Sequence, residues 1–392
     1  MLDEDAAAGR PLPGKVLDAG CGVGVIGICA AAVDPGIAVR CQDRDELARV
    51  FALHNAAKNK VSLEACAEPL LAGQPGERWD LILTNIPAKA GTSVLEDFVR
   101  RSAGLLNPGG RVVMVAVRTL AGFFREQIAL AGAELLSEQE GSGHVVLAYA
   151  PGEPRRSGDP VDARPGFLAR YPFYARGVAW DKIEGVPVRI EAAHGAPGFD
   201  EAGAAVAVAA KLAARLGPEK LAPAGNAPLL VHEPGQGFFP CWLLEFLRGG
   251  CRAEIPPVVL SGRNVLALEA ARHNVSRLIP QDAAPEASGA TAVPAADLNL
   301  GRQALLEAAG GTRYSCVAAF PELLPQSSLP KGTDQLAALW DALSHLLAPG
   351  GVFLVALGSS DAERFDRKKP SGLARLGGIK RNGFRALAYR LA

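Results

Sequence analysis

The chain has 392 residues, of which 49% are hydrophobic and 21% charged, and its formal net charge is zero. This composition is typical of a soluble globular protein, and the length favours two domains over one core. The zero net charge excludes a protein drawn to nucleic acid or membrane by its overall field, so any such binding must come from a local patch.

The first residues, MLDEDAAAGRPLPGK, are acidic and lack the apolar core of a signal peptide. No apolar run approaches the roughly 20 residues needed to span a bilayer. Seven cysteines are scattered without the paired spacing of a metal site, which favours a reducing compartment. We therefore expect a cytoplasmic protein with no metal and no membrane partner.

Short strand-like runs alternate with helical runs through the first 150 residues. The runs that favour strands lie at 15–20, 37–42, 61–66, 79–85, 111–117, 133–139 and 144–150. Helical stretches, such as residues 46–59 and 94–106, separate most of them, which predicts βαβ units and a mainly parallel sheet. Only EGSG separates the last two runs, so the sheet should end in an antiparallel hairpin.

A glycine loop follows the first strand, in the stretch VLDAGCGVGVIG at residues 16–27. Its Gly22-x-Gly24-x-x-Gly27 spacing matches the dinucleotide fingerprint, and Asp43 lies about twenty residues further on. That spacing alone does not distinguish a pyrophosphate from another ligand.

The residues around the loop favour a cationic ligand. Glycines at 20, 22 and 24 remove Cβ atoms that would prevent close approach. A carboxylate at Asp18, before them, would repel a pyrophosphate but suits an amino or sulfonium cation. We predict that Asp18, Gly20, Gly22 and Gly24 bind such a ligand; the alternative is a tight strand-to-helix turn that binds nothing.

Asp43 ends the second predicted strand. Its two oxygens can accept hydrogen bonds from both hydroxyls of a ribose. The alternative is that Asp43 only caps the next helix, a role that Asp45 fits better.

The stretch DLILTNIPAK, residues 80–89, contains a buried strand that stops at Asn85 and turns at Pro87. Ligands of open α/β sheets bind beyond the carboxyl ends of the strands, which places Asn85 beside the glycine loop. Its amide oxygen can accept a hydrogen bond from a substrate N–H and so orient an amine toward an electrophilic methyl group. The alternative is an ordinary Asn-x-Pro turn.

Residues 151–166 are rich in Pro, Gly and charge, as in a linker. Beyond them the pattern of the first part recurs in the same order. The stretches at 227–247, 256–278, 314–324 and 343–357 repeat those at 14–33, 38–59, 79–91 and 102–116. We predict a tandem duplication: residues 1–150 as the catalytic domain, 151–184 as a linker and 185–392 as a second copy with a lead-in segment.

The second copy retains the apolar pattern and loses the polar residues. Val231 and Glu233 stand where the first copy has Asp18 and Gly20, Gly262 replaces Asp43, and Ala319 or Phe320 replaces Asn85. The second copy is therefore predicted to be degenerate.

VLDAGCGVG, the acid after the second strand, HNAAKN and NIP together resemble the class I S-adenosylmethionine-dependent methyltransferases. More narrowly, they resemble the "methyltransferase small domain" group, and the tandem copies resemble ribosomal RNA guanine-N2 methyltransferases. The resemblance implies two tandem Rossmann-like seven-stranded α/β domains, S-adenosylmethionine as cofactor and RNA as substrate. It places Asn85 and Pro87 in the catalytic motif and Glu68 near the adenine, although an exposed Glu is the alternative for residue 68.

The chain departs from that group at two points. The N-terminal copy, not the C-terminal one, holds the site residues, and Ile86 and Ala88 replace a proline and an aromatic residue of the motif. Two alternatives follow: a protein glutamine N-methyltransferase, or an inactive scaffold that binds ligand or RNA. Residues 364–390 carry nine cations and one acid, which predicts either a phosphate-binding segment or a solvated face.

Overall fold

The computed structural model describes residues 13–72, 76–152, 168, 171–198, 200–221, 227–250, 256–279, 290–325, 327 and 331–392. The chain divides into two compact units, residues 1–175 and 176–392. This division falls inside 151–184, the stretch predicted as a linker, in which Ala175–Ile183 forms strand β8.

The first unit is built on one seven-stranded sheet. Its strands are β1 (Lys15–Ala19), β2 (Ala38–Asp43), β3 (Glu64–Ala67), β4 (Trp79–Asn85), β5 (Leu106–Val117), β6 (Glu134–Glu140) and β7 (His144–Ala150). They lie in the order β3-β2-β1-β4-β5-β7-β6, and only the pairs that involve β7 are antiparallel. The parallel sheet with a terminal antiparallel hairpin is as predicted.

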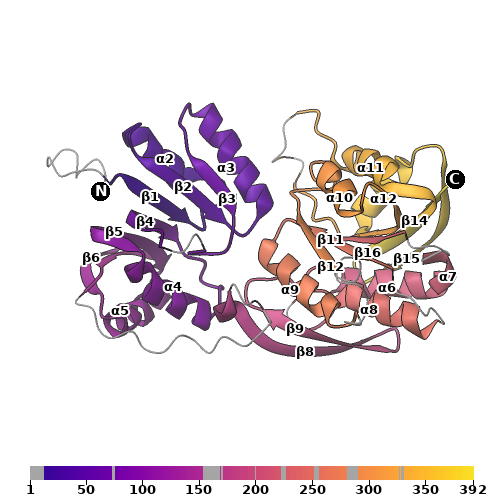
Figure 1. Cartoon of the computed structure of the whole chain (residues 1–392), viewed down its shortest axis with the longest axis horizontal. Helices are drawn as coiled ribbons and strands as arrows, with labels where there is room; N and C mark the ends of the chain where they lie inside the picture. Colours follow the sequence, from indigo (N-terminus) through magenta and orange to yellow (C-terminus); the bar gives the residue numbers. More distant parts are fainter. Residues whose placement is uncertain are drawn as a thin grey trace. The chain divides into compact units, whose positions relative to one another are not determined.

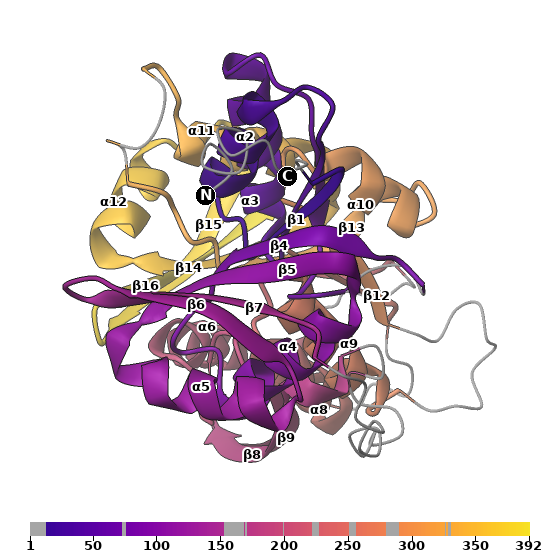
Figure 2. The ribbon, with the colours of Figure 1, turned by 90° about the vertical axis from the view of Figure 1, so that its left-hand side faces the viewer.

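Helices cover both faces of this sheet. Helices α2 (Val25–Val33) and α3 (Glu46–Lys58) lie on one side, and α4 (Thr92–Gly104) and α5 (Ala121–Leu130) on the other (Figure 1). Figure 2 shows β6 and β7 beside β5, with α4 and α5 below them. Two short 3-10 turns, η1 (Arg118–Leu120) and η2 (Pro172–Tyr174), complete the unit.

The coverage on both faces explains why the central strands are apolar along their length. Val16 and Leu17 of β1 and Leu81 and Ile82 of β4 are each at most 1% exposed. A strand with only one buried face would alternate between apolar and polar residues. Helix α3 begins where the sequence predicts, because the Asp45 side chain accepts a hydrogen bond from the Leu47 N–H at 2.9 Å.

The second unit repeats this topology. Its sheet is formed by β10 (Leu229–His232), β11 (Val258–Gly262), β12 (Ala290–Pro294), β13 (Tyr314–Ala319), β14 (Leu347–Gly358), β15 (Leu373–Arg381) and β16 (Phe384–Leu391). The order, β12-β11-β10-β13-β14-β16-β15, is that of the first sheet strand for strand. Its helices are α7 (Pro218–Leu221), α8 (Phe238–Gly249), α9 (Val265–Ser276), α10 (Arg302–Ala308), α11 (Gln335–Leu346) and α12 (Ser359–Arg367). The prediction of two tandem Rossmann-like seven-stranded domains is confirmed.

A lead-in precedes the second sheet: the hairpin of β8 and β9 (Val186–Ala193), followed by helix α6 (Ala204–Leu216). The Asn274 amide of α9 binds both backbone groups of Glu191 in β9, at 2.8 and 2.9 Å. The Trp242 indole N–H of α8 donates to the Ile183 carbonyl at 3.0 Å. These contacts hold the hairpin against two helices of the second unit.

Two glycines in helices differ in the space around them, and this difference can be measured. A Cβ atom on Gly27 of α2 would lie 2.4 Å from the Cys41 sulfur, whereas one on Gly122 of α5 would meet no atom of the described residues within 4 Å. We expect Gly27→Ala to lower the free energy of unfolding by about 1–3 kcal/mol through overpacking. Gly122→Ala, the matched control, should be neutral or stabilising by up to about 1 kcal/mol, because alanine favours helix. Urea denaturation of both variants checks this, and equal effects would contradict the close packing at Gly27.

Candidate active site

The glycine loop after β1 is attached to the end of β2 by its backbone. The N–H groups of Gly20 and Cys21 both donate to the Gln42 carbonyl oxygen, at 2.8 and 3.0 Å. The φ angles of Gly20, Gly22 and Gly24 are 77°, 54° and 86°, in the left-handed region that glycine adopts most readily. A Cβ on Gly24 would lie 3.0 Å from a side chain of α3, so this end of the loop also needs glycine for its close approach.

Asp18 lies beneath this loop and is fully buried. Its Oδ2 atom accepts a hydrogen bond from the Gly27 N–H at 2.7 Å, and its buried Oδ1 atom has no hydrogen-bond partner among the described residues. Burial raises the pKa of this carboxyl to about 6; the Gly27 hydrogen bond lowers the pKa, and the nearby Asp43 carboxylate raises it. Asp18 therefore supports the loop from below with a carboxylate that is costly to ionise.

Asp43 is the last residue of β2 and faces the loop. Its Oδ2 atom accepts a hydrogen bond from the Gly22 N–H and its Oδ1 atom one from the Asp45 N–H, both at 3.0 Å. A carboxylate oxygen can accept a second hydrogen bond, so each atom retains a lone pair for a ligand hydroxyl. A Cβ on Gly22 would meet no described atom within 4 Å, so the space in front of the loop is open at this point.

Asn85 is the last residue of β4, and its side chain is exposed. The preceding residue fixes this end of the strand, because the Thr84 hydroxyl donates to the Ala19 carbonyl of β1 at 2.7 Å. The carboxyl ends of β1 and β4 are thereby joined where the order of the sheet reverses direction. Open α/β sheets bind their ligands at such a reversal.

A pocket of about 180 Å³ lies at these strand ends, lined by Gly20, Asp43, Arg44, Leu70, Asn85, Pro87 and Tyr174. Four of the predicted site residues, Gly20, Asp43, Asn85 and Pro87, thus face one cavity. Asp18, Gly22, Gly24 and Glu68 are not among the residues that line it. Asp18 lies under the loop, and Gly22 reaches the pocket only through its hydrogen bond to Asp43.

Glu68 follows β3, and its N–H donates to the Asp43 carbonyl at 2.7 Å. Its carboxylate has a long contact, 3.4 Å, with the side-chain amide of Gln42. That amide donates more closely to the carbonyls of Pro69 and Ala72, at 2.8 and 2.6 Å. Gln42 therefore holds the segment after β3, which places the Leu70 side chain over the glycine loop, 3.2 Å from a Cβ built on Gly20.

Sequence reasoning missed Gln42, Arg44, Leu70 and Tyr174. In the sequence, Gln42 is one residue of a predicted strand. No neighbouring residue indicates that its side-chain amide is buried and hydrogen-bonded. Tyr174 belongs to a run of aromatic residues, YPFY at 171–174, that could have been noticed as an apolar anchor inside the predicted linker, beyond its stretch rich in Pro and Gly. Nothing in the sequence indicates that Tyr174 and Asn85 line the same pocket.

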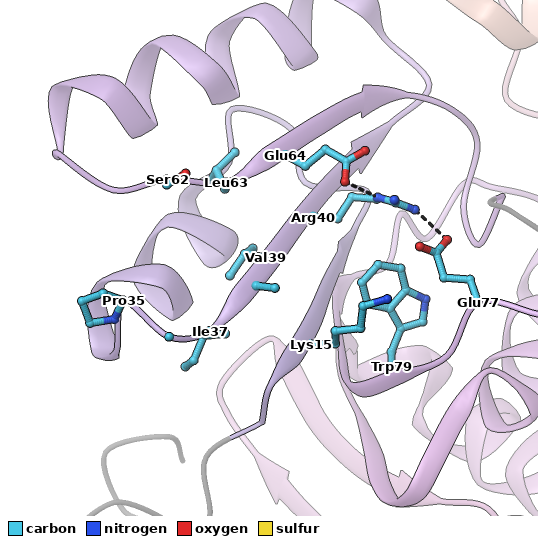
Figure 3. Close-up of a pocket in the computed structure, with 12 residues that line it drawn as sticks. Lys15, Pro35, Ile37, Val39, Arg40, Ser62, Leu63, Glu64, Glu77 and Trp79 are labelled. Carbon is cyan, nitrogen blue, oxygen red and sulfur yellow. Dashed lines mark hydrogen bonds and ion pairs between the residues drawn. The ribbon is translucent and has the colours of Figure 1, made fainter.

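A second and larger hollow, of about 460 Å³, lies at the opposite ends of the strands of the same sheet (Figure 3). Arg40 crosses it beside Trp79 and bonds with the carboxylates of Glu64 and Glu77, at 3.0 and 2.6 Å. These charges satisfy one another, and the hollow lies at the amino ends of the strands. We therefore assign the site to the smaller pocket at the carboxyl ends. Among the described residues, no cluster of three or more His, Cys, Asp or Glu side chains could hold a metal ion.

The corresponding position in the second unit is filled by the protein itself. Glu233, with φ of 53°, takes the place of Gly20, and its N–H donates to the Ser261 carbonyl at 2.6 Å. Its carboxylate accepts a hydrogen bond from the Arg263 N–H at 2.9 Å and would lie 3.2 Å from a Cβ on Gly262. The carboxylate of Glu233 thus occupies the place that corresponds to the Asp43 side chain.

The strand register also decides which residue replaces Asn85. Val231 of β10 pairs with Ala318, as Asp18 of β1 pairs with Leu83, so Phe320 corresponds to Asn85. The Phe320 ring packs against Phe239, with centroids 4.9 Å apart. Apolar packing thus replaces the polar group at this position, and the degeneracy of the second copy stays a prediction.

A glycine loop after the first strand, with an acid after the second and Asn-x-Pro after the fourth, defines the first unit as a class I methyltransferase domain. Residues 5–139 match the family described as methyltransferase small domain, and the first unit belongs to this family. The predicted resemblance of this part of the chain to the methyltransferase small domain group is confirmed by this match. No helix among the described residues is long and apolar enough to cross a membrane.

Several characterised proteins resemble parts of the chain. It is 40% identical over 111 residues to ribosomal RNA small subunit methyltransferase C of Hahella chejuensis, covering 27% of this chain and 32% of that protein. It is 33% identical over 109 residues to ribosomal protein L11 methyltransferase of Syntrophotalea carbinolica, covering 27% and 33%. The chain thus spans about a third of the length of the curated relatives it matches.

The two-unit fold also has a solved counterpart. A 16S rRNA N2 methyltransferase of T. thermophilus, solved in complex with AdoMet and guanosine, aligns with a TM-score of 0.65 over 98% of this chain and 89% of that one. The sequence identity is 17%, so this alignment establishes the tandem fold and nothing further.

The buried carboxyl of Asp18 predicts a pH dependence of stability. Its folded pKa of about 6 lies above the ordinary value of 3.8 for an Asp carboxyl, so the folded protein binds this proton more tightly than the unfolded chain. The Asp18 contribution is therefore most favourable below about pH 4 and is lost as the pH rises through 6, by about 2 kcal/mol. Asp18→Asn keeps an acceptor for the Gly27 N–H but does not titrate.

The unfolding free energy of Asp18→Asn minus that of the wild type should therefore rise by about 2 kcal/mol between pH 4 and pH 7. Denaturant titrations at both pH values measure it. A difference that does not change with pH would show that Asp18 titrates normally.

Proposed function

We propose that this protein transfers a methyl group from S-adenosylmethionine to an exocyclic amine of a base in ribosomal RNA, in the first unit. The observation that supports this most directly is the single pocket shared by Gly20, Asp43, Asn85 and Pro87. It brings together the residues proposed for the methyl donor and those proposed for the acceptor. The names of the relatives support RNA as the substrate.

The residues around the loop fit the donor. The open space at Gly22 leaves room for the methionine part, and the buried Asp18 carboxyl provides negative charge beneath it. The free lone pairs of Asp43 suit the ribose hydroxyls. Glu68, at the end of β3, is proposed to lie near the adenine. When bound, S-adenosylmethionine supplies an electrophilic methyl group: its S–C bond breaks as the N–C bond forms, sulfur keeps the electron pair, and the amine proton leaves to solvent.

Asn85 and Pro87 are proposed to orient the acceptor. The Asn85 amide oxygen accepts a hydrogen bond from the amine N–H, which points the nitrogen lone pair at the methyl group. This bond strengthens as the nitrogen acquires positive charge, so it contributes most in the transition state. Pro87 fixes the turn that holds Asn85 at the strand end. The remaining contribution of the protein is positioning of the two reactants.

The basic residues at 364–390 contribute less to RNA binding than their number indicates. Several cations of the segment form ion pairs: Arg364 with Asp361, Lys368 with Asp334, Arg375 with Asp366 and Arg385 with Glu363. Three of these four acids lie outside the segment: Asp361 and Glu363 stand directly before it, and Asp334 caps helix α11. We therefore base the RNA proposal on the first unit's pocket.

One cofactor site per chain is expected, in the first unit, because Glu233 fills the equivalent place in the second. Isothermal calorimetry with S-adenosylmethionine should give a stoichiometry of one. Asp43→Ala should weaken binding by roughly tenfold to a hundredfold, since charged hydrogen bonds contribute about 1.5–3 kcal/mol each. Asp45→Ala, which removes a nearby helix-capping acid, is the matched control and should leave the affinity nearly unchanged. A stoichiometry of two, or tighter binding of NAD, would contradict the assignment.

Asn85→Ala should lower turnover by about 10²–10³-fold with the affinity for S-adenosylmethionine nearly unchanged. The assay is transfer of tritiated methyl to RNA and to protein fractions from a strain that lacks the gene. Asn59→Ala, an amide at the end of α3, serves as control and should retain wild-type turnover.

The labelled fraction distinguishes the alternatives. Label in ribosomal RNA supports the proposal, and label in a protein fraction would favour glutamine methylation instead. No transfer to either fraction would leave a binding scaffold, and full activity of Asn85→Ala would remove Asn85 from the acceptor site.

A further inference from the structure

The hairpin of β8 and β9 has one buried face and one exposed face. Ala179 of β8 and Val188 and Ile190 of β9 are each at most 4% exposed and belong to the core of the second unit. The alternate residues of β8 point the other way, and among them Trp180 is 66% exposed and Val178 47% exposed. The hairpin therefore turns a large aromatic side chain toward solvent.

The exposure of Trp180 sets it apart from the other tryptophans. The chain has four, and Trp79, Trp242 and Trp340 are each at most 5% exposed. Large apolar side chains that lie together on a surface mark places where partners bind. The indole of Trp180, next to the exposed Val178, is available to such a partner.

Two helices hold the hairpin in place. The Trp242 indole N–H of α8 donates to the Ile183 carbonyl, and the Asn274 amide of α9 binds both backbone groups of Glu191. Figure 1 shows β9 alongside these two helices. Trp180 is thus presented on a fixed strand, so a partner binds without first having to order the backbone.

Cations surround the exposed indole. The Arg189 guanidinium of β9 lies over the Trp180 ring, 5.8 Å from its centroid. Arg176 and Lys182 are exposed and lie on the same face of β8 as Trp180, by the alternation of the strand. Arg176 is paired with Asp200 at 2.9 Å. The Lys182 ammonium has no partner among the residues that the structure describes.

The acids of the hairpin do not cancel this positive charge. Glu191 lies 3.3 Å from Arg277 and 3.6 Å from Arg189, so one carboxylate offsets two guanidinium groups. Asp181 turns to the other face, where it accepts a hydrogen bond from a backbone N–H just before α6 at 2.8 Å. Glu184 stands in the turn at the end of the hairpin. The face with Trp180 therefore carries an excess of cations.

An exposed ring among cations matches the chemistry of single-stranded nucleic acid. Bases stack on aromatic side chains while Lys and Arg contact the phosphates. Lysine is depleted at protein–protein interfaces, so Lys182 beside the indole favours a polyanion over an apolar protein partner. Because the whole chain has no net charge, a local patch of this kind is what RNA binding requires.

We propose that the exposed face of the β8–β9 hairpin is an RNA-binding surface, where Trp180 stacks on an unpaired base and Lys182 and Arg189 contact phosphates. This inference rests on the proposed function, because RNA is the proposed substrate. It adds that the second unit binds the RNA. Six residues along the chain separate Trp180 from Tyr174 of the pocket.

Tryptophan fluorescence tests this surface directly, because the other three tryptophans are buried. A single-stranded oligoadenylate of about 12 nucleotides should quench the fluorescence of the wild type and protect it from iodide. An RNA duplex of the same length should do so much less, since its bases are already paired and stacked. Trp180→Phe should lose both the iodide quenching and the response to RNA.

Affinities are compared by the fluorescence anisotropy of labelled oligoadenylate. Trp180→Ala should raise Kd about tenfold, whereas Trp180→Phe, which keeps a ring, should stay within about threefold. Leu300→Ala is the matched control, because it removes another exposed apolar side chain, 65% exposed, of the second unit and should bind as the wild type does. Lys182→Ala should lower the slope of log Kd against log salt by about 0.7.

The same variants are then tested for folding and activity. Because Trp180 is exposed, Trp180→Ala should keep its thermal midpoint within about 2 °C of the wild type. In the methyl-transfer assay its KM for ribosomal RNA should rise, with kcat and the Kd of S-adenosylmethionine unchanged.

Equal affinity of Trp180→Ala and the wild type for oligoadenylate would overturn the inference and leave the proposed function intact. Shielding of Trp180 from iodide in the protein without RNA, together with a molecular mass that falls in Trp180→Ala, would assign the surface to self-association and also overturn it. If RNA binds at Trp180 but the wild type transfers no methyl group to RNA, the RNA-binding surface stands and the proposed function fails.

Discussion

The geometry of the first unit's site depends on the carbonyl oxygen of Gln42, which accepts hydrogen bonds from Gly20 and Cys21. These bonds fold the glycine loop over the carboxyl end of β2 and bring Gly22 within hydrogen-bonding distance of Asp43. The side-chain amide of Gln42 holds the segment after β3 through the carbonyls of residues 69 and 72. One buried residue therefore positions two of the segments that border the pocket.

The second unit keeps this backbone arrangement, although other side chains replace the polar residues proposed to bind the methyl donor. Glu233 makes the same hydrogen bond to β11 that Gly20 makes to β2, although its side chain fills the site. The helix that follows also keeps its contact: the Asn55 amide donates to the Val23 carbonyl and the Asn274 amide to the Gln236 carbonyl, both at 3.0 Å. Backbone hydrogen bonds and apolar packing maintain the fold, so a duplicated copy can lose its polar residues and still form the sheet.

The aromatic residue that lines the pocket comes from outside the Asn-x-Pro turn. The turn η2 lies at the end of the first unit, immediately before the lead-in hairpin of the second. Its aromatic residues pack on α4, and this packing carries Tyr174 to the pocket. The segment between the two sheets thus contributes a side chain to the pocket of the first unit.

The sequence by itself determined the order of the strands and helices, the duplication and the position of the glycine loop. These features depend on residues close together in the chain: apolar runs, the Asp45 cap and glycines between a strand and a helix. The pairing of Asp43 with the loop and of Asn85 with the pocket also follows, because parallel strands end at one edge of the sheet.

Tertiary structure alone decided which side chains share the pocket and what each one contacts. Asp18 was expected to meet the ligand, yet its position under the loop is set by burial and by the Gly27 N–H. The ion pairs of the basic segment join it to acids elsewhere in the chain. Tertiary structure also decided the positions of Tyr174 and Gln42, because long-range packing and buried hydrogen bonds produce no periodic pattern in the sequence.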